Sequence, residues 1–264
     1  MSEPTLLLAD GGNTAPFQPL RPRMIRSAAD ARTAYESEVN RHAWWVALAA
    51  DGLRHLVALR PRASRAGCLL VLKPVSPQRR AFVDTLFADV LAPAEPDGFL
   101  SARELVDVFR SPNAEDLFIG GDVDLADRVV ILYRGNLHRI AVPFDWFKTR
   151  RGAPKPDFKD FAITDSGQTV RLGDYEAAAD AILYEFDAGA RRRMNQRAIR
   201  EDQSFGGALR RLRLQRGVSR TAFPGIDAKT IARIERGEVE TPHEATLAVI
   251  AKLLGVEPRE IATY

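Results

Sequence analysis

The chain has 264 residues, and 45% of them are hydrophobic, which is enough for the packed cores of about two domains. Its apolar runs are much shorter than the roughly 18 residues of a membrane-spanning helix, and no basic segment precedes the first leucines. A single cysteine, Cys68, excludes an internal disulfide framework. These features predict a globular cytoplasmic protein with neither a membrane span nor a signal peptide.

The net charge of +3 hides a strong asymmetry along the chain. Residues 191–264 hold 15 Lys and Arg against 9 Asp and Glu, whereas residues 1–190 hold 23 against 26. The C-terminal quarter therefore carries +6 and the remainder −3. Clustered positive charge favours binding to a polyanion, although a basic, solvated surface would have the same composition.

The first 125 or so residues mix several kinds of signal. Residues 1–24 are rich in Gly and Pro and lack periodicity, which predicts a flexible tail. Residues 27–44 have a helical pattern, and apolar stretches on both sides of Asp51-Gly52 predict a hairpin. A buried strand at 68–73 and a helix over 77–91 are expected to follow.

Two further hairpins are expected after a possible subdomain boundary near residue 125. One pairs residues 129–133 with 137–142, and the other pairs 161–164 with 169–172. Asp174 is placed to cap a helix over 174–186. Residues 25–190 are therefore predicted to form an α+β region, which we expect to serve dimerisation, partner binding or ligand sensing.

The sequence after residue 190 predicts a change of structural class. Residues 191–203 are strongly basic and form either a linker or a connecting helix. From Ser204 to the end, capping residues, apolar positions at helical spacing and terminating glycines predict five short helices. The fold class is therefore an α+β N-terminal region followed by a small all-α domain over 204–264.

Three sequence blocks within this small domain carry a family resemblance. They begin at Gly206 with GGALRRLRLQRGVS, continue with TIARIERG from Thr230, and end with AKLLGV from Ala251. In this order they resemble the helix-turn-helix of phage-repressor-type regulators, the Xre family, over residues 204–261. The resemblance implies that the second helix crosses the DNA backbone and that the third, residues 227–236, lies in the major groove.

The resemblance also assigns roles to individual side chains. Base reading is expected from three residues on the third helix: Ala228, Lys229 and Arg233. Phosphate contacts are expected from Ser219, Arg220, Thr230 and Arg236. Glu235 is expected to form a structural ion pair with Arg213, as the matching residues do in the family. Only 15 residues separate Ser219 from Glu235, about three fewer than usual, which predicts a shortened second helix.

The N-terminal region contains no pattern that specifies a reaction. His42, His55 and His138 lack metal-ligand spacing with one another and with Cys68. Gly120-Gly121-Asp122 is best interpreted as a turn. We therefore expect no catalytic residue, no cofactor and no metal site, and the chain is not expected to be an enzyme.

Two functions remain open from the sequence. The favoured one is a sequence-specific transcriptional regulator that binds an inverted-repeat operator in double-stranded DNA as a homodimer, with a protein partner or small-molecule effector at its N-terminal region. The alternative is an antitoxin whose N-terminal region neutralises a toxin while its C-terminal domain represses the operon. This alternative draws on residues 129–183, which faintly resemble DUF2442-type modules, some of which look like antitoxin components.

Overall fold

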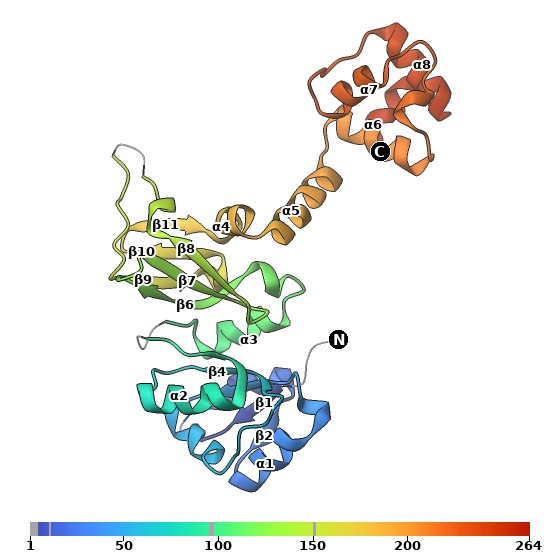
Figure 1. The fold of residues 1–264 in the computed structure, drawn as a ribbon. Helices are drawn as coiled ribbons and strands as arrows, with labels where there is room; N and C mark the ends of the chain where they lie inside the picture. The colour runs from blue at the N-terminus through green and yellow to red at the C-terminus, as the bar shows by residue number, and fades with distance from the viewer. Residues whose placement is uncertain (1–4, 11, 95–97, 150–151) are drawn as a thin grey trace. The chain divides into compact units, whose positions relative to one another are not determined.

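The computed structural model describes residues 5–10, 12–94, 98–149 and 152–264. The chain divides into two compact units, residues 1–186 and residues 187–264, and Figure 1 shows both. The first unit mixes strands with helices and the second is helical, so the predicted α+β fold with a helical C-terminal domain is confirmed.

A parallel sheet forms the first part of unit 1. Its five strands lie in the order β2-β1-β3-β4-β5, and every neighbouring pair is parallel. Their bounds are β1 (Thr5–Leu8), β2 (Arg23–Ile25), β3 (Trp44–Ala47), β4 (Ala66–Val71) and β5 (Phe87–Leu91). The strands are apolar on both faces, because helices and 3-10 turns cover both sides of the sheet.

The predicted flexible tail is wrong for the residues described between 5 and 24. β1 lies inside the sheet between β2 and β3, with Leu6, Leu7 and Leu8 buried. Residues Ala15–Leu20 form a 3-10 helix, η1, with Phe17 buried. A parallel strand buried on both faces has no alternation of apolar and polar residues, so a short run among Gly and Pro resembled a loop.

The predicted hairpin around Asp51-Gly52 is also wrong. β3 pairs with β1 and β4, and residues Ala50–Leu56 form a 3-10 helix, η3. Leu53 and Leu56 are three residues apart and both enter the core, a spacing that suits a 3-10 helix better than a strand. Gly52 packs closely against the sheet, since a Cβ atom there would lie 3.2 Å from Leu8 Cβ.

Helices pack on both faces of the parallel sheet. One face is covered by α1 (Ala28–Glu36), η3 and α2 (Pro77–Leu86), whose buried residues form one core with the strands. Against the other face, Phe109 of α3 (Ala102–Arg110) contacts Trp44 of β3, with ring centroids 5.3 Å apart. The 77–91 segment was expected to be all helix, but α2 ends at Leu86 and β5 follows directly.

Two antiparallel sheets complete unit 1. One contains β6 (Phe118–Asp124), β7 (Val129–Arg134) and β8 (Arg139–Pro143), and the other contains β9 (Phe161–Thr164), β10 (Thr169–Leu172) and β11 (Tyr175–Ala178). Both predicted hairpins are confirmed, in the registers Val129↔Pro143 and Thr164↔Thr169.

Two expectations in this part of the chain are wrong. The helix capped by Asp174 begins only at Ala179, as α4 (Ala179–Phe186), because Tyr175–Ala178 pair with β10. Gly120 and Gly121 lie inside β6 and not in a turn. A Cβ atom at Gly120 would lie 2.3 Å from Gly98 O, so glycine here allows two backbone segments to approach closely.

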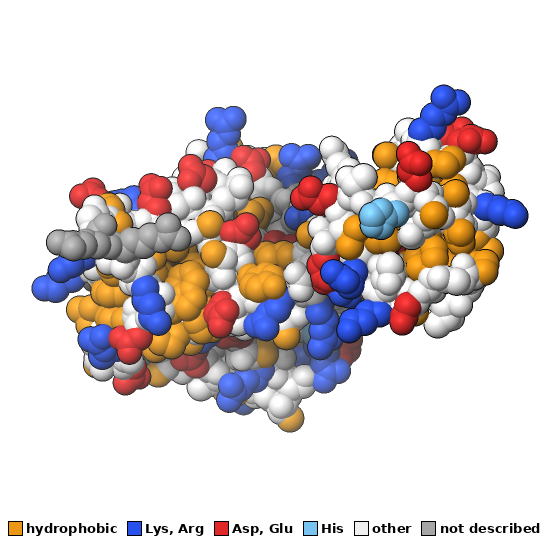
Figure 2. Space-filling view, turned by 90° about the horizontal axis from the view of Figure 1, so that it is seen from above, with side chains coloured by type: hydrophobic (Ala, Val, Ile, Leu, Met, Phe, Trp, Pro, Cys, Tyr) orange, Lys and Arg blue, Asp and Glu red, His pale blue; other side chains and the backbone are white. Residues whose placement is uncertain are grey.

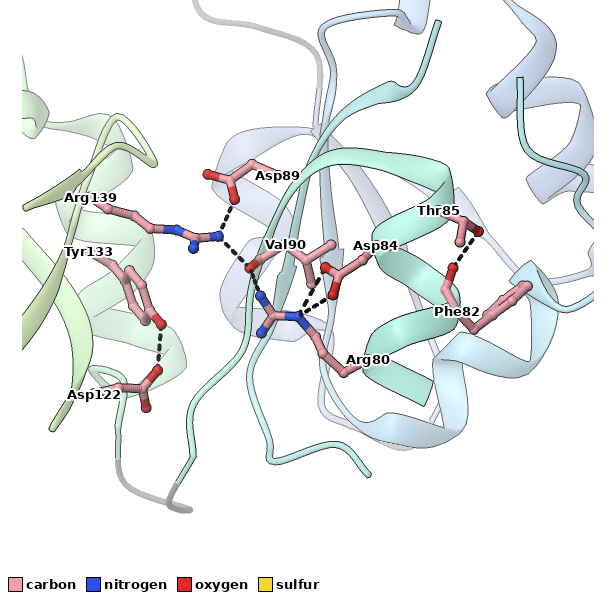
Figure 3. Close-up of polar contacts among 9 residues, drawn as sticks. All are labelled: Arg80, Phe82, Asp84, Thr85, Asp89, Val90, Asp122, Tyr133 and Arg139. Atoms are coloured by element: carbon pink, nitrogen blue, oxygen red, sulfur yellow. Dashed lines mark hydrogen bonds and ion pairs between the residues drawn. The ribbon is translucent and has the colours of Figure 1, made fainter. Parts of the chain in front are cut away.

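Polar contacts join the parallel sheet to the first antiparallel sheet (Figure 3). Val90 O, on β5, accepts hydrogen bonds from Arg139 Nη2 and from Arg80 Nη2, each at 2.8 Å. The Tyr133 hydroxyl donates to Asp122 Oδ2 at 2.5 Å. Burial, followed by the neighbouring Asp122 carboxylate, raises the pKa of Tyr133 well above its ordinary range.

The second unit consists of helices and 3-10 turns. α5 (Ala188–Glu201) is the connecting helix that was one of two alternatives for the basic segment. The five expected helical segments follow it: α6 (Phe205–Gln215), η7 (Arg220–Ala222), α7 (Ala228–Glu235), α8 (Glu244–Leu254) and η8 (Pro258–Thr263). Their shared core contains Leu209, Leu212, Phe223, Ile231, Ile234, Ile250, Ala251, Leu254 and Ile261.

Candidate nucleic-acid interface

The sequence of α7 explains both its bounds and its exposed face. Asp227 accepts a hydrogen bond from Lys229 N at 2.8 Å and so caps the first turn. Ile231 and Ile234 are buried three residues apart, which directs Lys229 and Arg233 to the solvent. Gly237, with φ of 73°, ends the helix in a conformation that favours glycine. α7 therefore has an exposed basic face, and both of its ends are fixed by specific residues.

The three predicted base-reading residues lie on this helix. Lys229 and Arg233 are exposed and Ala228 is half-buried. Arg233 Nε donates to Glu238 Oε2 at 3.3 Å, and Arg236 Nε donates to Glu238 Oε1 at 2.6 Å. Binding to DNA would require Arg233 to exchange this carboxylate for an acceptor on a base. Since the pair is exposed, this exchange has a small energetic cost.

Glu235 lies on the buried side of the same helix and has no exposed side-chain surface. Its Oε1 accepts a hydrogen bond from Arg213 Nε at 2.5 Å, and Arg213 Nη2 lies 3.3 Å from Oε2. Arg213 Nη1 also donates to Val218 O at 2.8 Å. The structure thus contains the expected ion pair, which fastens α7 to α6 and to the turn after α6.

Arg220 is a second cation on the same carboxylate. Its Nε and Nη2 lie 2.8 Å and 2.7 Å from Glu235 Oε2, and 40% of its side chain is exposed. Burial alone would raise the pKa of Glu235, but the hydrogen bonds from Arg213 and Arg220 together hold that pKa below its ordinary value. One carboxylate thus faces two guanidiniums, which leaves a net positive charge beside α7.

The shortened second helix is reduced to one 3-10 turn, η7, followed by Pro224-Gly225. Phe223 is buried, and Ile226 packs against the same core, so the shortened segment still contributes to the core of the domain. Of the remaining phosphate candidates, Ser219 and Arg236 are exposed and Thr230 is half-buried. Ser219 Oγ lies 2.8 Å from Thr221 Oγ1 at the start of this turn.

A close backbone approach brings α6 and α7 together. A Cβ atom at Gly206 would lie 2.2 Å from Ile234 O, which is closer than any real Cβ contact. Glycine is therefore required at this position for packing. This requirement explains the glycine with which the first of the three sequence blocks begins.

Sequence reasoning missed two residues that shape this surface. Glu238 holds both Arg233 and Arg236, a contact that the run Arg233-Ile234-Glu235-Arg236-Gly237-Glu238 suggests only once the turn at Gly237 is known. Arg211 donates to Tyr264 O through Nη2 at 2.6 Å and so ties the last residue to α6. No spacing in the sequence predicts that second contact.

Figure 2 shows hydrophobic side chains gathered on one face of the C-terminal domain, among polar surface and charged side chains. Exposed hydrophobic residues of the domain include Leu214, Leu253 and Tyr264, at 59%, 39% and 39% exposure. A surface of this composition suits contact with protein better than contact with phosphate.

No group of three or more potential metal ligands that could hold an ion occurs among the residues that the structure describes. His55, one of the three histidines considered in the sequence, contacts Asp10 Oδ2 through Nε2. In the part of the chain covered by the structure, no helix is both long enough and apolar enough to cross a membrane.

The buried arginine–glutamate pair, the exposed basic helix and the compact helical core together resemble a DNA-binding module. Residues 204–263 match the family model of a helix-turn-helix domain. The helix-turn-helix segment predicted from the sequence is thus confirmed, without assignment to the Xre family. Searches of curated proteins and of solved structures found no match to the chain.

Proposed function

We propose that the protein is a transcriptional regulator that reads DNA sequence with α7 in the major groove. The helix-turn-helix domain supports DNA binding as such. The observation that carries the finer proposal is the position of Glu235, which fixes the rotation of α7 from inside the domain. With Ile231 and Ile234 also turned inward, Lys229 and Arg233 are the basic side chains left for the groove.

Phosphate contacts are proposed from two arginines beside the C-terminal end of this helix, Arg220 and Arg236. Arg220 keeps its guanidinium partly exposed while Glu235 holds it in place, so little side-chain entropy remains to be lost when it binds an anion. Arg236 lies at the C-terminal end of α7 and is exposed. Such contacts fix the position of the domain on the duplex but carry no sequence information.

We propose that the protein binds DNA as a homodimer on an inverted repeat. One recognition helix covers too few base pairs for operator-level specificity, and two-fold symmetry doubles the site. The exposed hydrophobic residues of the C-terminal domain and the large first unit both offer surface for self-association. Light scattering of the full chain, free and bound to its operator, tests this part, and a monomer in both states would exclude it.

The experiment that tests DNA binding uses the full chain and genomic duplex fragments over a range of salt concentrations. Affinity should fall steeply with salt, because each phosphate contact releases bound counterions. Lys229→Ala and Arg233→Ala should reduce affinity for the preferred fragments more than for unrelated DNA. An equal loss on all fragments would show that these two residues do not read bases.

A further inference from the structure

A basic cleft lies beside the amino-terminal ends of two interior strands of the parallel sheet, far along the chain from the helix-turn-helix domain. It lies between the second half of α1 and the segment that connects η3 to β4, and it has a volume of about 530 Å³. These elements precede β3 and β4, so the cleft opens at the amino-terminal ends of those strands. Its volume falls within the range of small-molecule sites, about 300–1,000 Å³.

Three arginines line this cleft: Arg32, Arg60 and Arg62. All three are exposed, and Glu36 is the one acidic residue in the lining. Among the described residues, the side chains of Arg32 and Arg60 make no hydrogen bond or ion pair, so both guanidiniums are free to bind an anion. This concentration of positive charge is notable because residues 1–190 carry a net negative charge.

The local sequence holds these arginines in place. Pro61 lies between Arg60 and Arg62. The proline ring fixes the φ angle of Pro61 and favours an extended backbone at Arg60, the residue before it. Arg62 Nη1 donates to Tyr35 O at 3.2 Å, which ties the connecting segment to α1. The Tyr35 ring is buried, and its hydroxyl donates to Leu86 O at 3.3 Å. The wall of the cleft is therefore fixed before any ligand binds.

The cleft continues into a second pocket of about 230 Å³ that shares Tyr35 and Arg62 with it. This pocket adds Arg41, Arg65 and Glu38, and Arg41 Nη2 donates to Ser64 Oγ at 2.7 Å. Glu38 lies 3.4 Å from Arg41 and 4.0 Å from Arg62, so it offsets part of the charge there, and the arginines without such a partner are Arg32 and Arg60 of the larger pocket. Ala58, Leu59 and Pro61 supply an apolar side to the larger pocket.

We propose that this cleft binds a small organic anion that carries phosphate or carboxylate groups. Guanidinium groups pair with both kinds of anion through two parallel hydrogen bonds, and here Arg32 and Arg60 would provide them. The apolar residues would contact the organic part of the ligand. The proposal goes beyond DNA binding and does not depend on it, because the cleft and its ligand can be studied without DNA.

The test is titration calorimetry of the full chain, without DNA, against three probes: inorganic pyrophosphate, citrate and ATP. At least one should bind at a single saturable site, and a preference for pyrophosphate or citrate distinguishes phosphate from carboxylate recognition. ATP includes an organic part and should bind more tightly than pyrophosphate if the apolar side contributes. The absence of saturable binding by all three probes would overturn the proposal.

Variants decide whether the binding belongs to this cleft. The double variant Arg32→Ala/Arg60→Ala should weaken binding by at least about tenfold, because it removes both charged hydrogen-bond donors. Arg103→Ala is the control, since Arg103 is an exposed arginine on α3 outside the cleft. An equal loss in both variants would indicate a general charge effect and would contradict the proposal. A double variant that retains full probe affinity, or that weakens binding of duplex DNA instead, would contradict it as well.

Discussion

Glu235, with no exposed side-chain surface, accepts a hydrogen bond at 2.5 Å from Nε of Arg213, which is itself buried. This pair joins the helix that is proposed to read DNA to the first helix of its domain. Removal of Glu235 leaves the buried Arg213 without a counter-charge, whereas removal of Arg213 leaves Glu235 with Arg220 as its one cationic partner among the described contacts. The stability of the domain and the orientation of α7 therefore depend on the same contact.

Glu235→Ala should lower the free energy of unfolding of the C-terminal domain by about 3–5 kcal/mol, because two guanidiniums lose their shared acceptor. Thermal or denaturant unfolding of the full chain measures the change. Glu238→Ala is the control, since Glu238 pairs with two exposed arginines in solvent and its removal should change the free energy of unfolding much less. Equal destabilisation by both variants would contradict the structural role of the buried pair.

The Glu235 carboxylate also predicts how the stability of the C-terminal domain depends on pH. The pKa of Glu235 is lowered in the folded state from its ordinary value of 4.5, so its contribution is fully present above that pH. It is lost as the pH falls below about 4.5, where the unfolded chain takes up the proton first. Unfolding of Glu235→Gln, followed between pH 3 and about 7, should therefore depend less on pH than that of the wild type. Parallel curves for the two proteins would argue against the lowered pKa.

Tyr133 is expected to make the stability of the first unit depend on pH in alkaline solution. The pKa of its hydroxyl is raised above the ordinary value of 10.0, first by burial and then by Asp122. The stabilisation that accompanies this raised pKa is present below pH 10 and is lost as the pH rises above it. Tyr133→Phe should weaken the alkaline destabilisation of the first unit, which unfolding curves at pH 9 and about 11 can measure. An equal loss of stability in the variant and the wild type would contradict the raised pKa of Tyr133.

The close approach of α6 and α7 predicts that a methyl group added at Gly206 lowers the stability of the domain. Gly206→Ala would place a Cβ atom 2.2 Å from Ile234 O, so one of the two helices must shift. We expect a loss of stability of about 1–3 kcal/mol and weaker DNA binding. Gly189→Ala on α5 is a suitable control, because its added Cβ would lie 3.1 Å from a movable carboxylate oxygen of Asp187. Unchanged melting of Gly206→Ala would show that the helices are less tightly packed.

Arg220 and Arg236 should affect DNA binding without affecting sequence preference. The substitutions Arg220→Ala and Arg236→Ala each remove one proposed phosphate contact. Each should therefore reduce the slope of log affinity against log salt concentration by about one unit. Arg216→Ala, at an exposed arginine after α6, is the comparison. A change in base preference in either variant would mean that the side chain reaches the bases.

Parts of this structure could be predicted from the sequence because the signals were local. The hairpins at 129–142 and 161–172 have turn residues between alternating strands, and α7 is marked by Asp227 and Gly237. The strands of the parallel sheet gave no such signal. Leu6, Leu7 and Leu8 are buried on both faces, so nothing in their pattern distinguishes a strand from an apolar stretch of loop.

The candidate site was predictable to a similar extent. The pairing of Glu235 with Arg213 was expected from the family resemblance, but the approach of Arg220 to the same carboxylate was not. It depends on the conformation of the shortened segment around Pro224-Gly225, which places η7 close to α7. The basic cleft also depends on tertiary structure, since it brings Arg32 of α1 beside Arg60 and Arg62.

Selection of bound duplexes from a random pool, by the full-length wild type and by Arg233→Ala, tests the central claim most directly. The wild type should enrich an inverted repeat whose half-sites are separated by one helical turn or a multiple of it. Arg233→Ala should lose about 1–3 kcal/mol at one position in each half-site, with relaxed base preference there and unchanged melting. No enrichment by the wild type, or an identical enriched sequence from both proteins, would contradict the proposal that α7 reads DNA through Arg233.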